Sequence, residues 1–217
     1  MRATGILLAG LIVVAFLGNE PDVRAPAGQP KPPVAGFPTF KTQEIDTGLS
    51  IGYAVLVADI NNDSKPDIVV VDQFEVVWYE NPTWKCRTII TNKTKPDNVC
   101  IAALDVDGDG HLDFVLGADW GPFNTKSGGT LQWLKRGKTL DEPWSVYPID
   151  TEPTVHRIRF ADIDGNGKKA LISVPLMGRG ATAKNNWTDG SPVRVTAYRI
   201  PADPTRDRWM PEVLNEE

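Results

Sequence analysis

An acidic nonapeptide occurs three times in this sequence, and its repetition constrains the fold more than any other feature. The copies begin at Asp59, Asp105 and Asp162 and align without gaps. A short apolar stretch precedes each copy, another follows it, and two further strand-like stretches come after that. Units of four short strands that recur at roughly 40 to 50 residues are typical of β-propeller blades. Because no stretch shows a sustained helical period, the sequence predicts an all-β partial propeller of about three to four four-stranded antiparallel blades.

The number of repeats is small for a propeller. Residues 37–217 are predicted to form the blades, with repeats at about 45–95, 96–150 and 151–214. Closed propellers contain roughly four to eight blades, so this stretch is too short for a complete ring. We expect the chain to be a fragment of a longer one that continues past Glu217 with further acidic nonapeptides, or a partner copy to supply the missing blades.

Residues 1–25 have the pattern of a secretory signal peptide. Arg2 precedes an unbroken apolar run over residues 5–17, and small residues follow at the spacing of a cleavage site. The run is shorter than the roughly 20 residues of a membrane span, so we expect a secreted or periplasmic protein with no membrane span after cleavage. An uncleaved membrane anchor is the alternative. The proline-rich stretch 26–36 is predicted to be an extended linker.

Charge and cysteine spacing argue against two kinds of binding site. The formal net charge is -5 and the isoelectric point is near 5.1, which argues against a protein that binds the phosphate backbone of nucleic acid. Cys86 and Cys100 fall in the last strand of one repeat and the first strand of the next. Because blade geometry separates these strands, both are expected to be buried free thiols, and no zinc-ligand pattern is present.

The repeated nonapeptide has the side chains of a calcium-binding loop. Oxygen ligands at positions 1, 3, 5 and 9, a backbone carbonyl at position 7 and glycine at position 6 suit a hard cation. The first loop has Ser64 at position 6 and the third has Ala170 at position 9, so only the second is complete. We expect calcium, with magnesium as the alternative ion; aspartate-rich surface turns without metal are the other interpretation. The predicted ligands are Asp59, Asn61, Asp63, Asp67, Asp105, Asp107, Asp109, Asp113, Asp162, Asp164 and Asn166.

These loops resemble those of FG-GAP/VCBS repeat proteins, whose blades carry D-x-D-x-D-G-x-x-D between their first two strands. The resemblance covers residues 37–217 and implies calcium-binding loops and membership of a ring of about seven blades. The segments 117–120, 155–159 and 175–180 are also similar to propeller segments of aldos-2-ulose dehydratase-like proteins. That resemblance implies elimination of water from a keto-sugar such as anhydrofructose. The cupin domain that such proteins can carry has no counterpart in this sequence.

The third repeat departs from the other two in the strand before its acidic loop. His156, Arg157 and Arg159 occupy positions where the other repeats have mostly apolar groups such as Leu56 and Ala102. Inner strands of a propeller pack on both faces, so burying two guanidinium groups is costly without an anionic or hydrogen-bonding partner. We therefore predict that these three residues form a catalytic site. Pairing with carboxylates of a neighbouring blade is the structural alternative.

The connection after the second predicted strand lengthens from repeat to repeat. It covers residues 73–75, 120–129 and 176–192 in the three repeats, and long loops often carry function. In an antiparallel blade this connection lies at the same end as the start of the first strand, so it should converge with His156. The acidic loops lie at the opposite end, about 20 Å away for a strand of six residues, which makes the metal structural. The predicted substrate-binding residues are Asp119, Trp120, Arg179 and Trp187.

Two classes of function are consistent with these patterns. The first is a carbohydrate lyase, or dehydratase, in which His156 moves a proton next to a carbonyl and Arg157 or Arg159 stabilises the enolate oxygen. Trp120 and Trp187 would then flank the sugar ring, whereas packing under the long connections is the alternative role of these tryptophans. The second is a non-catalytic, exported, calcium-stabilised propeller that recognises a glycan or a protein. Composition alone favours the second class.

Overall fold

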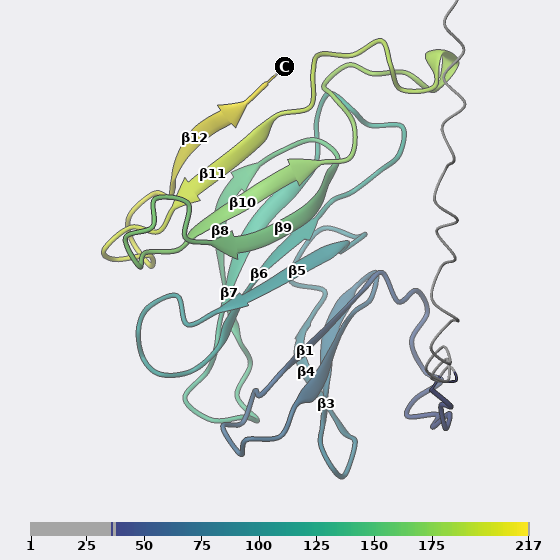
Figure 1. Ribbon diagram of the computed structural model, residues 1–217, viewed down its shortest axis with the longest axis vertical. Coiled ribbons are helices and arrows are strands. Elements are labelled where there is room, and N and C mark those ends of the chain that lie inside the picture. The colour runs from purple at the N-terminus through teal and green to yellow at the C-terminus, as the bar shows by residue number, and fades with distance from the viewer. Residues whose placement is uncertain (1–35, 37, 217) are drawn as a thin grey trace, which may run out of the picture. The chain divides into compact units, whose positions relative to one another are not determined.

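The computed structural model describes Gly36 and residues 38–216 (Figure 1). The chain divides into two compact units, Met1–Gln43 and Glu44–Glu217. The described residues of the first unit contain no helix or strand. The predicted signal peptide, residues 1–25, lies outside the described residues, as does the predicted linker apart from Gly36.

The second unit consists of three antiparallel sheets of four strands each, and each sheet follows chain order. Every blade therefore has the first strand of its repeat at one edge and the last at the other, which confirms the all-β, partial-propeller prediction. Each acidic loop joins the first two strands of a blade. The strands are β1 (Ala54–Ala58), β2 (Asp67–Val71), β3 (Glu75–Glu80) and β4 (Lys85–Thr91); β5 (Cys100–Leu104), β6 (Asp113–Ala118), β7 (Thr130–Lys135) and β8 (Ser145–Thr151); and β9 (Val155–Ala161), β10 (Ala170–Pro175), β11 (Val195–Arg199) and β12 (Met210–Asn215).

Alternating side chains of the strands pack neighbouring blades together. One core joins the first and second blades and includes Trp78 and Phe114, both almost fully buried. A second core joins the second and third blades and includes Trp133 and Tyr198. Period-two alternation lets the middle blade bury both of its faces, and the first strands β1, β5 and β9 lie next to one another in that order.

The two outer faces of this three-blade stack are covered less completely. On β1, Val55 and Val57 point away from the second blade and are 65% and 61% exposed. On the same face of the sheet, where Val55 is opposite Val70, Ile45 and Leu49 pack against the small cluster of Val70, Val77 and Tyr79. On β9, Arg157 and Arg159 alternate with Ile158, which packs towards the middle blade. On the first strand of the third blade, Arg157 and Arg159 therefore lie on the opposite sheet face from Ile158.

A single turn of 3₁₀-helix, Ala183–Asn185, lies in the long connection between β10 and β11. Among the described residues, no helix has the length and apolarity to cross a membrane. Both cysteines are free, as predicted, because β4 and β5 belong to different sheets. The prediction of two buried thiols is wrong for Cys86, which is exposed on the edge strand of its blade, whereas Cys100 on β5 is buried.

Candidate functional site

The carboxylate at position 1 organises the backbone of each acidic loop. Asp105 accepts hydrogen bonds from the backbone N–H groups at loop positions 4, 5 and 6, at 2.8, 3.1 and 2.9 Å. Asp59 and Asp162 accept the bonds from positions 5 and 6 of their own loops. Ser64 adopts a left-handed φ of 67° at the position where glycine is preferred. The three loops therefore share one backbone conformation despite their sequence differences.

The carboxylate at position 9 has a different role, because it holds the loop to the third strand. Asp113 is fully buried and accepts hydrogen bonds from the backbone N–H groups of Val106 and Arg136, at 3.3 and 2.9 Å. Asp67 makes the same pair of bonds in the first blade. Burial raises the pKa of Asp113 to about 6. Ala170 cannot make this connection in the third blade.

The side chain at position 3 contacts the last residue of the third strand in every blade. In the second and third blades that last residue is a cation paired with an aspartate, whereas in the first blade an amide faces a carboxylate. The ammonium of Lys135 also lies 3.7 Å from the carboxylate of Asp109. In the first loop Lys65 pairs with Asp63 at 3.0 Å, so a cation of the protein itself lies at all three loops. The pairs are Asn61 with Glu80, Asp107 with Lys135, and Asp164 with Arg199.

The second loop gathers the carboxylate oxygens best suited to a divalent cation. One oxygen each of Asp105, Asp107 and Asp109 lies within 4.8 Å of the others. Three carboxylates in a glycine-containing turn are the kind of donor set that calcium binds. The carboxylate of Asp113 is engaged with backbone N–H groups, so it contributes to the frame of the loop.

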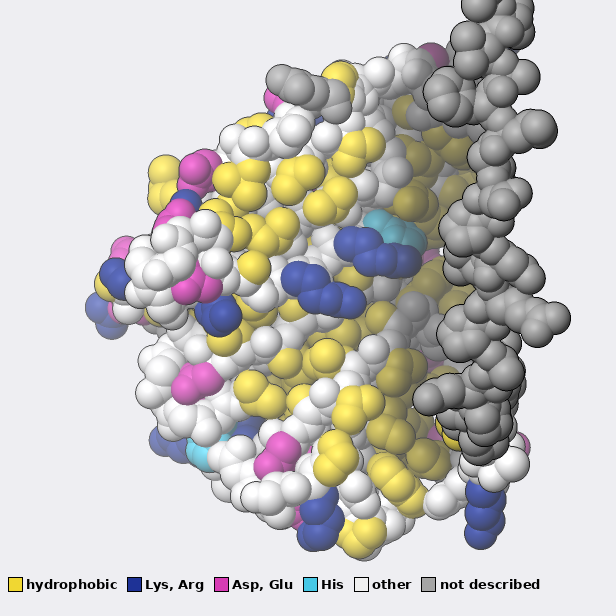
Figure 2. All heavy atoms as spheres, viewed as in Figure 1, with side chains coloured by type: hydrophobic (Ala, Val, Ile, Leu, Met, Phe, Trp, Pro, Cys, Tyr) yellow, Lys and Arg dark blue, Asp and Glu magenta, His cyan; other side chains and the backbone are white. Residues whose placement is uncertain are grey.

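A pocket of about 270 Å³ lies at the other end of the blades, beside the beginnings of the first strands. Its walls come from β1 and β5 and from the cationic residues of β9, namely His156, Arg157 and Arg159. We call this the inner-strand pocket. Figure 2, viewed from the same side as Figure 1, shows cationic side chains among hydrophobic ones over the inner strands. One concave site therefore contains all three residues of the predicted catalytic set.

A β-bulge places His156. The register of β9 against β10 runs from Arg157 opposite Val174 to Val155 opposite Pro175, so His156 is the additional residue. Bulges re-aim side chains and are common next to functional sites. The imidazole ring lies 5.7 Å from the indole ring of Trp120, which belongs to the long connection of the middle blade. Burial, and secondarily the charge of Arg157, lowers the pKa of His156.

The two arginines are exposed, so the prediction that they are buried between blades is wrong for this structure. Arg157 folds back on His156, bonding its ring nitrogen and, at 2.9 Å, its carbonyl oxygen. Arg159 donates to the carbonyl oxygen of Ile158 at 2.8 Å. Among the described residues neither guanidinium forms a salt bridge with a carboxylate. Both cations thus face the inner-strand pocket without a bound countercharge from a neighbouring blade.

Tyr53 and Asp97 complete the polar rim of this region, and the sequence did not single them out as site residues. The hydroxyl of Tyr53 donates to Asp97 at 3.3 Å, and Gln73 donates to the same oxygen at 3.0 Å. Burial, together with the charge of Asp97, raises the pKa of Tyr53. The sequence did contain a signal for Tyr53, because this residue stands at the same position of the first repeat as His156 in the third.

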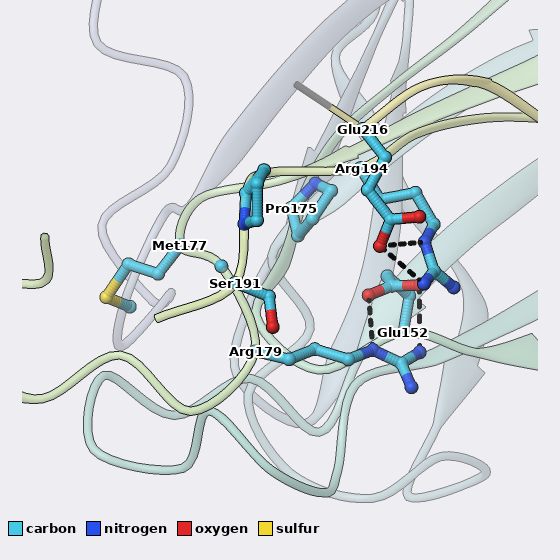
Figure 3. A pocket seen from close by; sticks show the side chains of 9 residues that line it. Glu152, Pro175, Met177, Arg179, Ser191, Arg194 and Glu216 are labelled. Carbon is cyan, nitrogen blue, oxygen red and sulfur yellow. Dashed lines mark hydrogen bonds and ion pairs between the residues drawn. The ribbon is translucent and has the colours of Figure 1, made fainter. Parts of the chain in front are cut away.

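The other predicted substrate-binding residues lie outside the lining of the inner-strand pocket. Asp119 pairs with Lys95 at 3.0 Å. Arg179 makes a two-fold contact with the buried carboxylate of Glu152, at 3.3 and 3.1 Å, beside the separate pair of Arg194 and Glu216 (Figure 3). Trp187 contacts Phe123, with ring centroids 5.8 Å apart. Of these four residues, only Trp120 contacts His156.

Residues 59–116 and 105–173 match the family described as FG-GAP-like repeat, and together they span more than half of the chain. The chain is also similar to aldos-2-ulose dehydratase of Phanerodontia chrysosporium, with 21% identity over 210 residues. That alignment covers 87% of this chain and 22% of the dehydratase, so the chain spans about a fifth of that protein's length.

Proposed function

This chain belongs to the FG-GAP-like repeat family, and we propose that its propeller binds a carbonyl-bearing sugar in the inner-strand pocket. The observation that carries the proposal is the placement of Arg157, Arg159 and His156 around one pocket, with no carboxylate paired to either arginine among the described residues. Guanidinium groups that have no carboxylate partner can donate charge-assisted hydrogen bonds to carbonyl and enolate oxygens. The weak similarity to a sugar-acting dehydratase supports the same ligand class.

Water elimination is the finer form of this proposal, and the state of His156 favours it. Its lowered pKa keeps the imidazole neutral near pH 7, where it can act as a base. The hydrogen bond from Arg157 occupies the lone pair of Nδ1, so this bond breaks before Nδ1 can act. The imidazole then takes the proton next to the sugar carbonyl, and the C–H electron pair forms a carbon–carbon double bond. The C–O bond of the neighbouring hydroxyl breaks, and the imidazolium returns the proton so that water leaves. Arg159 stabilises the negative charge on the carbonyl oxygen during this step.

Non-catalytic recognition is the alternative, in which the same pocket retains the sugar unchanged. Incubation of the protein with 1,5-anhydrofructose separates the two forms. Elimination creates an unsaturated ketone whose ultraviolet absorbance grows with time. Saturable binding without that absorbance supports recognition alone, whereas no binding at millimolar sugar contradicts the proposed function in both forms.

The proposal includes export and calcium. Export rests on the signal-peptide pattern of residues 1–25. Calcium rests on the oxygen cluster of Asp105, Asp107 and Asp109, with the loops of Asp59 and Asp162 as related sites. The ion would join the first two strands of a blade by neutralising like charges, and Lys135 would give up its contact to Asp107. Because the acidic loops and the inner-strand pocket lie at opposite ends of the strands, this role is structural.

A further inference from the structure

We infer that the connections 119–129 and 176–194 together form a second carbohydrate-binding site, at which Phe123 and Trp187 stack against a ring of a glycan chain. We call this pair the aromatic platform. It lies in a different cavity from the inner-strand pocket, and no residue lines both cavities. The inference therefore goes beyond the proposed function and does not depend on it.

Hydrogen bonds between the two connections hold the aromatic platform together. Thr125 is buried and donates its hydroxyl to the carbonyl oxygen of Ala181 at 2.9 Å. The backbone N–H of Gly180 returns a bond to Thr125 at 3.2 Å. The loops belong to different blades, so neither blade alone forms the cavity. Such cross-loop bonding reduces the entropy that would otherwise be lost on ordering the site around a ligand.

The backbone holds Trp187 in a conformation that a bulky residue rarely adopts. Its φ is 62°, in the left-handed region. The N–H of Trp187 donates to the carbonyl oxygen of Thr182 at 2.9 Å. The carboxylate of Asp189 fixes the same turn by accepting bonds from Thr182 and Asn185 at 2.6 and 2.7 Å. Backbone strain that the surrounding structure maintains is common at ligand-binding sites.

The lining of the cavity suits a sugar better than a peptide. The rings of Phe123 and Trp187 are tilted by 47°, and Phe123 is 80% exposed. Their partners around a cavity of about 330 Å³ are small or polar, and no large aliphatic side chain occurs among the described lining residues. A groove that binds an amphipathic helix is hydrophobic, and one that adds a peptide strand needs a free sheet edge; this lining of two connections offers neither. Aromatic faces pack against the C–H face of a sugar, and polar groups such as Lys126 and Asn124 can bond its hydroxyls.

Titration with oligosaccharides tests the inference. Maltoheptaose, cellohexaose and laminarihexaose are added separately to the complete chain while tryptophan fluorescence and calorimetric heat are recorded. We expect at least one of the three to bind saturably. For that sugar, Trp187→Ala and Phe123→Ala should each weaken the affinity about tenfold or more. The matched control is Phe74→Ala, because Phe74 is an exposed phenylalanine in the corresponding connection of the first blade.

The outcomes separate this site from the inner-strand pocket. His156→Ala should leave oligosaccharide affinity unchanged, and Trp187→Ala should leave binding of 1,5-anhydrofructose unchanged. Failure of all three oligosaccharides to bind the unaltered protein would overturn the inference. Equal affinities of the unaltered protein and the Phe123→Ala and Trp187→Ala variants would overturn it as well. If the unaltered protein binds an oligosaccharide but does not bind 1,5-anhydrofructose, the result counts against the proposed function and leaves the aromatic platform supported.

Discussion

The indole ring of Trp120 lies 5.7 Å from the imidazole ring of His156. The two residues come from different blades, one from a connection after the second strand and the other from a bulged first strand. Packing of these blades therefore sets the position of the imidazole. Through this contact, the long connection of the middle blade reaches a residue that lines the inner-strand pocket.

The pKa of His156 should be measurably below the usual value of about 6.5. The partly buried position of the ring and the charge of Arg157 both disfavour the imidazolium. The unfolded chain takes up this proton at higher pH than the folded protein, so the free energy of unfolding should decrease as pH falls through about 6.5. NMR titration checks this, with His111, the other histidine, distinguished by a His156→Gln variant. A midpoint at or above 6.5 would count against a neutral base.

Calcium should raise the melting temperature, because the acidic loops need a countercharge beyond the one that the protein supplies. Asp105→Ala should remove most of that increase. Lys135→Met should lower the calcium concentration needed for half of it, since the ammonium competes for Asp107. Lys138→Met, which changes an exposed lysine outside the loop, is the control. A melting temperature that changes with neither calcium nor chelator would refute the calcium proposal.

Asp113→Ala should destabilise the protein far more than Asp107→Ala when both are measured in chelator. The first change leaves two backbone N–H groups unpaired next to a buried position, at about 1–3 kcal/mol for each buried donor. The second removes a partly exposed ion pair, worth about 1 kcal/mol or less. Urea denaturation gives both free energies of unfolding. Equal losses would show that position 9 does not connect the loop to the third strand.

Thiol titration should distinguish the two cysteines. The exposed Cys86 should react in the native protein, although partial desolvation of its thiol raises its pKa and slows the reaction. Cys100 is buried and its pKa is raised to about 12, so it should react only after denaturation. Counts of one thiol before and two after unfolding are expected without reductant. A count of zero after unfolding would reveal a disulfide and contradict the separation of β4 from β5.

The sequence repeats were sufficient to predict the three blades and the positions of their strands. The acidic nonapeptides mark the turn between the first two strands, and the alternation of apolar residues identifies both faces of the middle blade. The bulge at His156 was not predictable in this way, because an additional residue leaves no mark in a gap-free alignment of the loops. The alignment assumes a regular strand before each loop.

The burial of Arg157 and Arg159 was mispredicted for a related reason. A repeat predicts that inner strands pack on both faces, but the third blade has a neighbouring described blade on one face only. The platform role of Phe123 could not be inferred from spacing, since its contact with Trp187 joins two loops of different blades. Likewise, the cations Lys135 and Arg199 are remote in sequence from the loops that they neutralise.

We expect Arg159 to serve a ligand and not the fold, and a paired measurement of binding and stability distinguishes the two roles. Calorimetric titration with 1,5-anhydrofructose and thermal melting are carried out on the unaltered protein and on Arg159→Ala, with Arg208→Ala as an exposed-arginine control. The exposed guanidinium of Arg159 has no carboxylate partner among the described residues, so its loss should abolish binding and leave the melting temperature nearly unchanged. Retained binding together with a large fall in melting temperature would show that Arg159 serves the fold and would contradict a sugar-binding role.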